Sequence, residues 1–486
     1  MLTVCVNKPQ FEYDIHSLVK AFYPEEEVKV ICGADEQDYK ILIEFGDTYI
    51  KMTLNIKKEP QIEEKVEEIA YDMNTDRQTV KNLLKQLIYN SLSEHLNIRL
   101  PWGTLTGIRP TKIPMAMLQE GKEDAEIMQY MKSTYFISEE KGALSIDIAK
   151  RERELLSSLH YKDGYSLYIG IPFCPTTCLY CSFTSYPICA WKKRVTEYLE
   201  VLEKEMVFVA EAFRDKVLDT VYIGGGTPTT LEPQELEWLL ASIEKHFDLS
   251  HLKEFTVEAG RADSITREKL KVLKKHNITR ISVNPQTMKE ETLKLIGRQH
   301  TVSQVKEAFE AAREVGFDNI NMDIILGLPE EAEEDVVNTI EEIKKLHPDS
   351  LTVHSLAIKR ASKMNQWIEE KGISTLRNTD ATMKIAAQAA QDMGMEPYYL
   401  YRQKNMSGNF ENVGYAAPGK YGIYNILIME EMQTIAALGA GSISKAVMAD
   451  GRIERTDNVK DVALYIERID EMIERKKKLF EPSGKP

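Results

Sequence analysis

The chain has 486 residues, of which 43% are hydrophobic and 28% charged, a composition typical of a folded globular protein rather than a disordered or fibrous one. Its 62 Lys and Arg against 76 Asp and Glu give a net charge of −14, which disfavours binding to nucleic acid and to anionic membranes. No apolar run has the length of a membrane helix and the first residues lack the apolar stretch of a signal peptide, so we expect a cytoplasmic protein without a membrane span.

Residues 1–100 are predicted to form an α+β domain, whose role the sequence does not indicate. The expected strands cover 2–6, 28–32, 39–45 and 46–54, with a hairpin turn at Gly46-Asp47, and the expected helices cover 63–73 and 77–92. Cys5 and Cys32 lie in apolar strand-like runs, so both are expected in the core. Residues 101–160 begin with a loop rich in Pro, Gly and Thr and continue as helices, and we expect them to connect this domain to a second one.

From residue 161 to about 395, short apolar runs alternate with amphipathic helical runs. The expected strands are 166–171, 219–225, 254–259, 280–284, 319–326 and 350–356. The expected helices lie near 191–213, 232–246, 266–275, 302–314, 330–346 and 375–393. Six successive βα units predict parallel strands in a full or partial (β/α) barrel, with an open doubly wound sheet as the alternative. Residues 396–486 form a C-terminal extension, in which the basic run 475–478 is expected to be a solvated helix end.

Three cysteines come after the first expected barrel strand with the spacing C-x3-C-x2-C, at Cys174, Cys178 and Cys181. Three thiolates on one short loop converge on a single inorganic centre, and a [4Fe-4S] cluster held by three of them keeps one iron open for another ligand. Structural zinc prefers four protein ligands, which leaves a zinc site with Cys189 as the fourth ligand as one alternative. Buried core thiols are the other.

Several residues near the ends of the expected strands suit a polar ligand site. Gly224, Gly225 and Gly226 come directly after a strand and allow close approach of the backbone, with a tight strand-to-helix turn as the alternative. Glu258 and Asp323 stand inside apolar strands, where a carboxylate is costly unless it is bonded. The carboxyl ends of barrel strands share one rim, where barrel enzymes place their chemistry.

The cysteine spacing, with Tyr180 before the third cysteine, resembles the signature of radical S-adenosylmethionine (SAM) enzymes. In order along the chain, 168–174, 223–231, 295–301 and 321–329 are similar to the oxygen-independent coproporphyrinogen III dehydrogenase family. The resemblance covers about 165 to 360 and returns at 437–445. The connector 102–112 and the segment 258–266 resemble the HemZ-type branch of that family.

The resemblance implies a [4Fe-4S] cluster on the three cysteines, SAM as second cofactor, and reductive cleavage of SAM to a 5′-deoxyadenosyl radical. It also implies hydrogen abstraction from the propionates of coproporphyrinogen III, loss of carbon dioxide and formation of protoporphyrinogen IX, with an electron donor that the sequence does not identify. The residues that this resemblance places around SAM are Tyr168, Tyr180, Gly224, Gly225, Gly226, Thr227, Glu258, Gln286, Arg298, Asp323 and Ala357. Candidate cations for substrate carboxylates are Arg109, Lys112, Lys359 and Arg360, for which a solvated surface is the more ordinary interpretation.

Three features depart from the family pattern. Phe183 stands where the dehydrogenase has a further cysteine, Gly170 stands where the family usually has histidine, and residues 1–100 have no counterpart in the dehydrogenase. The related haem chaperones also have an aromatic residue at the position of Phe183. The leading interpretation is therefore a porphyrinogen decarboxylase, the second is a haem chaperone, and the third is a radical enzyme with another substrate such as RNA.

Overall fold

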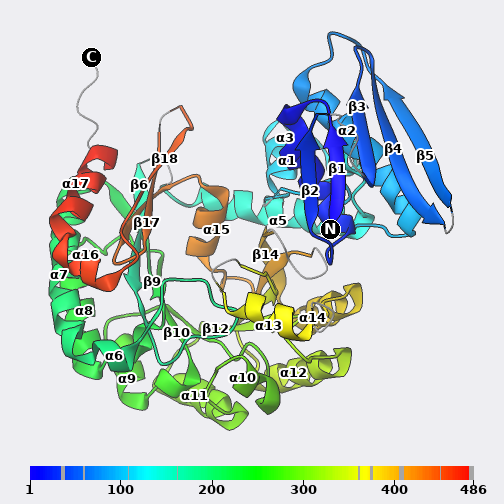
Figure 1. Cartoon of the computed structure of the whole chain (residues 1–486). Coiled ribbons are helices and arrows are strands. Elements are labelled where there is room, and N and C mark those ends of the chain that lie inside the picture. Colours follow the sequence, from blue (N-terminus) through cyan, green and yellow to red (C-terminus); the bar gives the residue numbers. More distant parts are fainter. Residues whose placement is uncertain are drawn as a thin grey trace, which may run out of the picture. The chain divides into compact units, whose positions relative to one another are not determined.

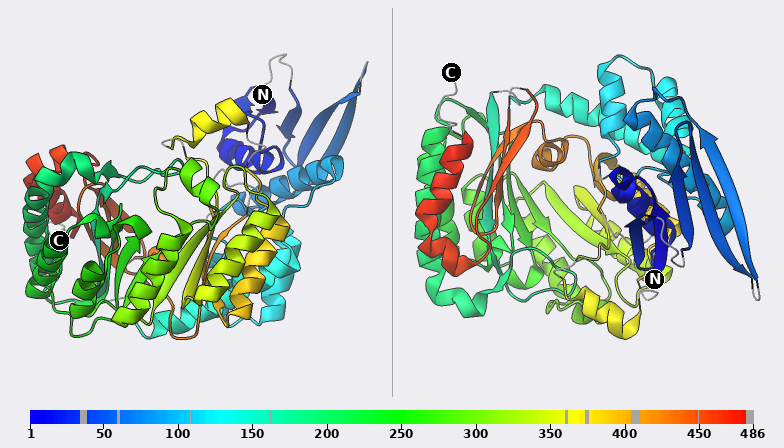
Figure 2. Two further views of the ribbon diagram at one scale, coloured as in Figure 1. Left: turned by 90° about the horizontal axis from the view of Figure 1, so that it is seen from below. Right: turned by 45° about the horizontal axis from the view of Figure 1, so that its top comes forward.

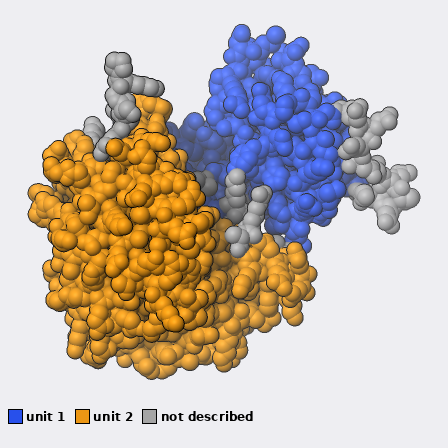
Figure 3. Space-filling model, turned by 60° about the vertical axis from the view of Figure 1, so that its left-hand side comes forward, with its two compact units in different colours: residues 1–150, 401–411 blue, residues 151–400, 412–486 orange. Residues whose placement is uncertain are grey.

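The computed structural model of the chain describes residues 1–33, 39–58, 61–107, 109–160, 163–359, 362–372, 376–403, 410–448 and 450–480. The chain forms two compact units, coloured separately in Figure 3: unit 1 is Met1–Lys150 with Tyr401–Glu411, and unit 2 is Arg151–Leu400 with Asn412–Pro486. The finer division into four segments stays a prediction. No helix of the described part of the chain is long and apolar enough to cross a membrane.

Unit 1 is built on a five-stranded sheet in the order β2-β1-β3-β4-β5. Its strands are β1 Leu2–Val6, β2 Val28–Cys32, β3 Ile41–Phe45, β4 Tyr49–Lys58 and β5 Gln61–Ala70. β1 is parallel to both of its neighbours, β2 and β3. β4 is antiparallel to both of its neighbours, β3 and β5. The backbone N–H of Gly46 donates to the carbonyl of Tyr49 at 2.9 Å, which confirms the predicted hairpin turn.

Five helices lie on this sheet or come after it in the chain. They are α1 Glu12–Phe22, α2 Arg77–Leu96, α3 Lys112–Gln119, α4 Asp124–Tyr135 and α5 Glu139–Ser157. The apolar faces of α1 and α2 share one core with the inner sides of β1, β3 and β4. Cys5 is buried, as predicted, but Cys32 is exposed because it ends β2, the edge strand of the sheet, so the core prediction is wrong for it.

The helix predicted for residues 63–73 is wrong, since β5 occupies Gln61–Ala70. The many Glu and Lys residues favour a helix locally, but β5 pairs with β4 through ten successive positions, from Lys58 opposite Gln61 to Tyr49 opposite Ala70. Charged side chains are also typical of an edge strand, where they prevent pairing with another chain. Tertiary pairing therefore overrides local propensity here.

Unit 2 contains an eleven-stranded sheet in the order β14-β15-β13-β12-β11-β10-β9-β6-β16-β17-β18. The central strands are β6 Gly164–Ile171, β9 Val217–Gly225, β10 Glu254–Gly260, β11 Arg280–Val283, β12 Ile320–Leu326 and β13 Ser350–Ser355. These six are parallel to one another, which confirms the six predicted βα units. Among the described residues the ladder does not join β14 to β18.

The helices between these strands lie along the outer side of the curved sheet (Figures 1 and 2). They are α7 Val195–Ala212, α8 Pro233–His246, α9 Arg267–Lys275, α11 Val302–Val315, α12 Glu333–Leu346 and α14 Asp380–Asp392. The other helices of this unit are α6 Ile188–Trp191, α10 Glu290–Leu295, α13 Met364–Lys371, α15 Ile423–Glu430, α16 Val462–Glu467 and α17 Ile469–Phe480. The predicted helices are thus present, with ends shifted by a few residues.

The two faces of the parallel strands differ in chemistry because side chains alternate along each strand. One face carries fully buried apolar residues at paired positions, such as Ile169 beside Ile223 and Val257 beside Ile281. The other face carries polar and aromatic residues at paired positions. These are Tyr168 with Tyr222, Thr256 with Arg280, Glu258 with Ser282, Ser282 with Asn321, and Asp323 with Thr352. The sheet thus has a polar inner face on which a ligand site can form.

The C-terminal strands extend the sheet beyond β13 on one side and β6 on the other. They are β14 Glu396–Tyr401, β15 Asn412–Ala416, β16 Thr434–Leu438, β17 Ile443–Val447 and β18 Ile453–Asp457. β16 is parallel to β6, and α17 packs against α7. The prediction that 475–478 is a solvated helix end is wrong for Lys476, which is fully buried and forms an ion pair with the equally buried Glu205 at 2.6 Å. The cation is paired within the fold rather than hydrated.

Candidate active site

The three cysteines of the predicted cluster lie on a loop that is pinned at both ends. Cys174 ends β7 (Phe173–Cys174), which pairs with β8 (Tyr186–Pro187) in a small parallel sheet of its own. Cys178 and Cys181 lie between these strands and are linked by a hydrogen bond from the N–H of Cys181 to the carbonyl of Cys178, 3.2 Å long. The three cysteines thus lie on one held segment, and their ligation of a single cluster stays a prediction.

A second segment, 296–298, holds this loop from the side. The N–H of Leu179 donates to the carbonyl of Ile296 at 3.0 Å, and the hydroxyl of Thr176 donates to the carbonyl of Gly297 at 2.8 Å. Gly297 has φ +80°, and a Cβ there would lie 3.2 Å from the carbonyl oxygen of Thr177. Glycine therefore allows the two loops to approach each other closely.

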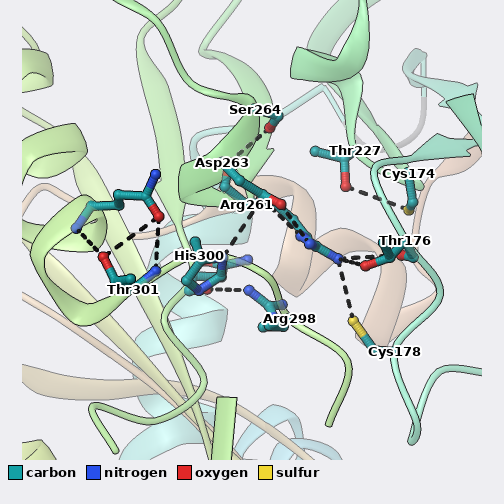
Figure 4. A network of polar contacts seen from close by, with 12 residues as sticks. Cys174, Thr176, Cys178, Thr227, Arg261, Asp263, Ser264, Arg298, His300 and Thr301 are labelled. Carbon is teal, nitrogen blue, oxygen red and sulfur yellow. Dashed lines mark hydrogen bonds and ion pairs between the residues drawn. The ribbon is translucent and has the colours of Figure 1, made fainter. Parts of the chain in front are cut away.

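Two cysteine sulfurs accept hydrogen bonds from side chains of other loops (Figure 4). Thr227 Oγ1 lies 3.4 Å from Cys174 Sγ, and Arg261 Nη1 lies 3.8 Å from Cys178 Sγ. Burial raises the pKa of the Cys174 thiol to about 11, while the Thr227 hydroxyl acts in the opposite direction. A metal centre and such donors both favour the thiolate form that ligates iron.

The zinc alternative gains no support from the geometry. Cys189 lies on α6 and is exposed. In the described ranges, no three His, Cys, Asp or Glu side chains are gathered closely enough to hold a single metal ion, the three loop cysteines included, so only the position of Cys189 distinguishes the two alternatives.

The glycines after β9 pack directly against the neighbouring strands. A Cβ on Gly226 would lie 2.5 Å from the carbonyl oxygen of Phe173, and one on Gly224 would lie 2.9 Å from the carboxyl carbon of Glu258. Gly225 has φ +103°, a conformation that favours glycine. The glycines thus let the backbone at the end of β9 lie against the cysteine-bearing strand and against the Glu258 carboxylate.

Three tyrosine rings stack on the inner face of the sheet. The ring of Tyr222 lies 4.5 Å from that of Tyr424 on α15 and 6.2 Å from that of Tyr168, at interplanar angles of 22° and 14°. The Tyr222 hydroxyl also donates to the carboxylate of Glu258. Burial raises the pKa of Tyr168 and Tyr222, so both stay protonated as donors at neutral pH.

Glu258 on β10 and Asp323 on β12 lie on the same face of the sheet and have opposite pKa shifts. Burial raises the pKa of Glu258 to about 7, the Tyr222 hydrogen bond lowers it, and the charge of Asp323 raises it further. Burial also opposes ionisation of Asp323, but hydrogen bonding from His354, with Asn321 and Thr352, holds its pKa below the ordinary value. Asn321 Nδ2 lies 2.6 Å from Asp323 Oδ1. Asp323 is therefore a fixed negative charge, whereas Glu258 exchanges a proton near neutral pH.

Buried polar atoms without hydrogen-bond partners lie next to these carboxylates. Among the described residues they include Ser282 Oγ, Asn284 Oδ1 and Gln286 Oε1. Gln286 adopts φ +69°, and its backbone is held by two hydrogen bonds of 2.9 Å, to the carbonyl of Asp323 and from the N–H of Ile325. A buried polar atom without a partner is costly, so these three atoms suit a polar ligand or water at this position.

Arg298 and Tyr180 connect this surface to the cysteine loop. The guanidinium donates to the Tyr180 hydroxyl through Nε at 3.3 Å and Nη2 at 3.2 Å, and to the carbonyl of Asn284 through Nη1 at 2.6 Å. The Tyr180 ring packs on a small apolar cluster that includes Ile296 and Leu356. Burial opposes the charge of Arg298, but the attraction of Tyr180 and Cys178 raises its pKa, so the cation persists.

Five residues of this site were not identified from the sequence. Arg261 and Asp263 form a two-bond ion pair with distances of 3.0 and 2.6 Å, and Asp263 lies 3.6 Å from the buried His300. Tyr222 and His354 contact the carboxylates described above. A signal for three of the five lies in 258–266 and 295–301, two segments that resemble the family and contain polar residues without an assigned role.

The remaining predicted residues lie at the margin of the site or outside it. Ala357 and Lys359 come after β13 and are partly exposed, and burial lowers the pKa of Lys359. Arg109 and Lys112 belong to unit 1, and Arg360 lies outside the described residues. Phe183 is 76% exposed, so an aromatic side chain at this position does not serve the core.

These residues fit a three-cysteine cluster with SAM beside it. The cysteine loop provides three thiols with donors to two of the sulfurs, the glycines leave no space for side chains at the end of β9, and the unpartnered oxygens offer acceptors to a polar guest. Asp323 and Arg298 add one fixed charge of each sign. The particular role of each residue stays a prediction.

Comparison with known proteins agrees with this geometry. The sequence pattern described as the Radical SAM superfamily matches residues 168–343. The chain is 40% identical to the oxygen-independent coproporphyrinogen-III oxidase-like protein HemZ of Bacillus subtilis (strain 168), over 97% of this chain and 96% of that protein. It is 39% identical to the heme chaperone HemW of the same organism, over 40% of this chain and 50% of that protein.

Among solved structures, coproporphyrinogen III oxidase (HemN) from Escherichia coli superposes with a TM-score of 0.51 at 21% identity, covering 66% of this chain and 73% of that one. This likeness shows a shared fold. The cofactors of the superfamily are a [4Fe-4S] cluster and SAM. The chain therefore belongs to the radical SAM superfamily and, within it, to the HemZ-type branch of the oxygen-independent coproporphyrinogen III oxidase-like proteins.

Proposed function

We propose that the protein oxidatively decarboxylates coproporphyrinogen III to protoporphyrinogen IX as a radical SAM enzyme. The observation that supports this reaction is the likeness over 97% of the chain to HemZ, a protein described as oxygen-independent coproporphyrinogen-III oxidase-like. The shared fold with coproporphyrinogen III oxidase (HemN) from Escherichia coli agrees with it.

In the proposed reaction, each of two propionate side chains loses one hydrogen atom from its β carbon, then carbon dioxide and one electron, and becomes a vinyl group. The cofactors supply the abstracting radical when they are bound, and a one-electron acceptor takes the electron that remains. The residues of the chain bind and orient the cofactors and the substrate. They also exclude water from the site. Cys174, Cys178 and Cys181 hold the cluster, and the polar inner face around Glu258 and Asp323 holds SAM.

The substrate carboxylates need cations at the rim of this site. Lys359 is the best-placed candidate, because it lies two residues after Ala357 at the end of β13 and its ammonium is partly desolvated. A desolvated ammonium gains from a carboxylate partner. The free cysteines of the chain fit a reducing compartment, so we place the reaction in the cytoplasm.

The second candidate function is a haem chaperone that keeps the cluster but does not decarboxylate. The exposed Phe183 supports it, because the dehydrogenase pattern has a cysteine there and the chaperones an aromatic residue. An exposed aromatic ring is a contact suited to a flat apolar ligand. The enzyme would bind coproporphyrinogen III and release carbon dioxide and protoporphyrinogen IX. The chaperone would bind haem and release no product from coproporphyrinogen III.

The test is anaerobic reconstitution of the protein with iron and sulfide, and then incubation with coproporphyrinogen III, SAM and a low-potential reductant. We expect protoporphyrinogen IX, detected after oxidation by fluorescence chromatography, and 5′-deoxyadenosine. Cys178→Ala is the matched control and should give neither product. Stoichiometric haem binding without any product from coproporphyrinogen III would refute the enzyme and support the chaperone.

A further inference from the structure

A buried histidine lies beside the loops that hold the cysteine loop. His300 stands between Arg298 and α11, directly before the helix cap Thr301, and is 2% exposed. Within the described ranges, neither of its ring nitrogens has a hydrogen-bond partner. A neutral imidazole has one donor and one acceptor, and burying both without partners is costly. An apolar side chain would avoid this cost, so the imidazole points to a role beyond packing.

One carboxylate lies close to this ring. His300 Nδ1 is 3.6 Å from Asp263 Oδ1, beyond hydrogen-bond distance but within the distance of an ion pair (Figure 4). The side chain of Asp263 is 16% exposed, so a proton from water reaches the buried ring past this carboxylate. Protonation would therefore convert an unpartnered ring into one member of an ion pair.

Asp263 connects the ring to the cysteine loop through Arg261. The two carboxylate oxygens of Asp263 accept from Arg261 Nε at 3.0 Å and from Nη2 at 2.6 Å. The remaining nitrogen of the guanidinium, Nη1, donates to the hydroxyl of Thr176 at 2.9 Å and lies 3.8 Å from Cys178 Sγ. Three successive contacts thus lead from the imidazole to a cysteine sulfur.

The charges around His300 keep it neutral until a further negative charge is added. Burial lowers the pKa of the imidazole, Asp263 raises it, and the positive charges of Arg298 and Arg261 lower it again, so that the net shift is downward. Reduction of a cluster on Cys178 adds one negative charge, which acts in the opposite direction and favours the imidazolium. By linkage, a proton on His300 then favours the reduced cluster to the same extent.

We propose that His300 takes up a proton when the cluster is reduced, and that Asp263 and Arg261 couple the imidazole to Cys178. One electron passes from the external reductant to the cluster, and one proton from water binds the free ring nitrogen, so the charge balances. His300 acts through Arg261 and is a positioning residue rather than a catalytic one. The inference rests on the cluster and is independent of the substrate proposed above.

The test is a redox titration of the reconstituted full-length protein at several pH values, monitored by electron paramagnetic resonance. The wild-type potential should become more negative as the pH rises within the range of about pH 5–8, where histidine titrates. The steepest slope for one proton and one electron is about 59 mV per pH unit, the equivalent of a tenfold change in proton concentration. His300→Gln should reduce this slope, whereas His16→Gln, which removes an exposed histidine of α1, should keep it.

The difference between the wild type and His300→Gln separates the imidazole from other groups that titrate in this range, such as Glu258. A second measurement covers the case in which His300→Gln fails to fold or to take up the cluster. Asp263→Asn removes the partner of the imidazolium and should move the pH-dependent range to lower pH. The proposal is overturned if the wild-type potential does not depend on pH. It is equally overturned if His300→Gln keeps the full slope or if Asp263→Asn leaves the range unchanged.

Discussion

Replacing Arg261 by Met tests whether this residue adjusts the reduction potential of the cluster. The guanidinium lies 3.8 Å from Cys178 Sγ, and reduction adds a negative charge to the cluster that this donor stabilises. A hydrogen bond to a charged group contributes about 1.5–3 kcal/mol. The carboxylate of Asp263, 2.6 Å from Arg261 Nη2, cancels part of the positive charge. We therefore expect about 1.4 kcal/mol, a shift of about 60 mV to more negative potential for a one-electron couple.

The assay is a redox titration of the reconstituted protein, monitored by electron paramagnetic resonance. Asp263→Asn removes the compensating charge and should shift the potential in the positive direction, a sign that a purely structural role of the pair does not explain. Arg267→Met, which removes an exposed arginine of α9, serves as the control. Equal potentials in all four proteins, or shifts of the same sign in the first two variants, would refute the electrostatic role.

Four further changes test the same contacts. Replacing any one of the three loop cysteines by Ala should abolish the brown iron–sulfur absorbance, and an intact spectrum would contradict the ligand assignment. Asp323→Ala should keep the cluster but weaken SAM binding at least tenfold by calorimetry, since a charged hydrogen-bond acceptor is lost. Lys476→Met leaves Glu205 buried without its cation and should lower the free energy of unfolding by about 3–5 kcal/mol in urea. With a pKa of about 7, Glu258 keeps its proton in the folded state after the unfolded state has released it. Stability therefore falls by up to about 3 kcal/mol between about pH 4.3 and 7, a slope that Glu258→Gln should remove in unfolding curves at the two pH values.

The alternation of strands and helices in unit 2 was predictable because buried parallel strands read as short apolar runs between amphipathic helices. The same reasoning failed at residues 61–70, where the charged composition indicates a helix and the pairing with β4 decides for a strand. It also failed for Lys476, whose partner Glu205 is 271 residues away in the sequence, so that a run of cations read as solvated. Local patterns thus identify elements but not their distant partners.

In the candidate site, too, local signals were predictable from the sequence and contacts between distant residues were not. The cysteine spacing and the carboxylates inside apolar strands are local signals, and both lead to the polar surface that the structure contains. Arg261 reaches Cys178 across 83 residues of sequence, and its position after β10 gives no local sign of that contact. His300 is similar, because its neighbour Asp263 lies on another loop. The order and register of the strands in the sheet decide which loops are neighbours. A single sequence does not reveal that order.

The polar groups of the inner face are satisfied differently at the two ends of the strands. In most (β/α) barrels this face is filled by branched apolar side chains, but here polar groups occur toward both ends of the strands. Toward the amino ends these groups satisfy one another: Thr220 donates to Ser166 at 2.8 Å, and Arg280 donates to Ser350 at 2.7 Å. Toward the carboxyl ends, Ser282, Asn284 and Gln286 keep acceptors without partners, beside the cysteine loop. Because buried polar atoms require partners, we expect a polar ligand or water to bind at the carboxyl-end half, and it is there that the cysteine loop would hold the cluster.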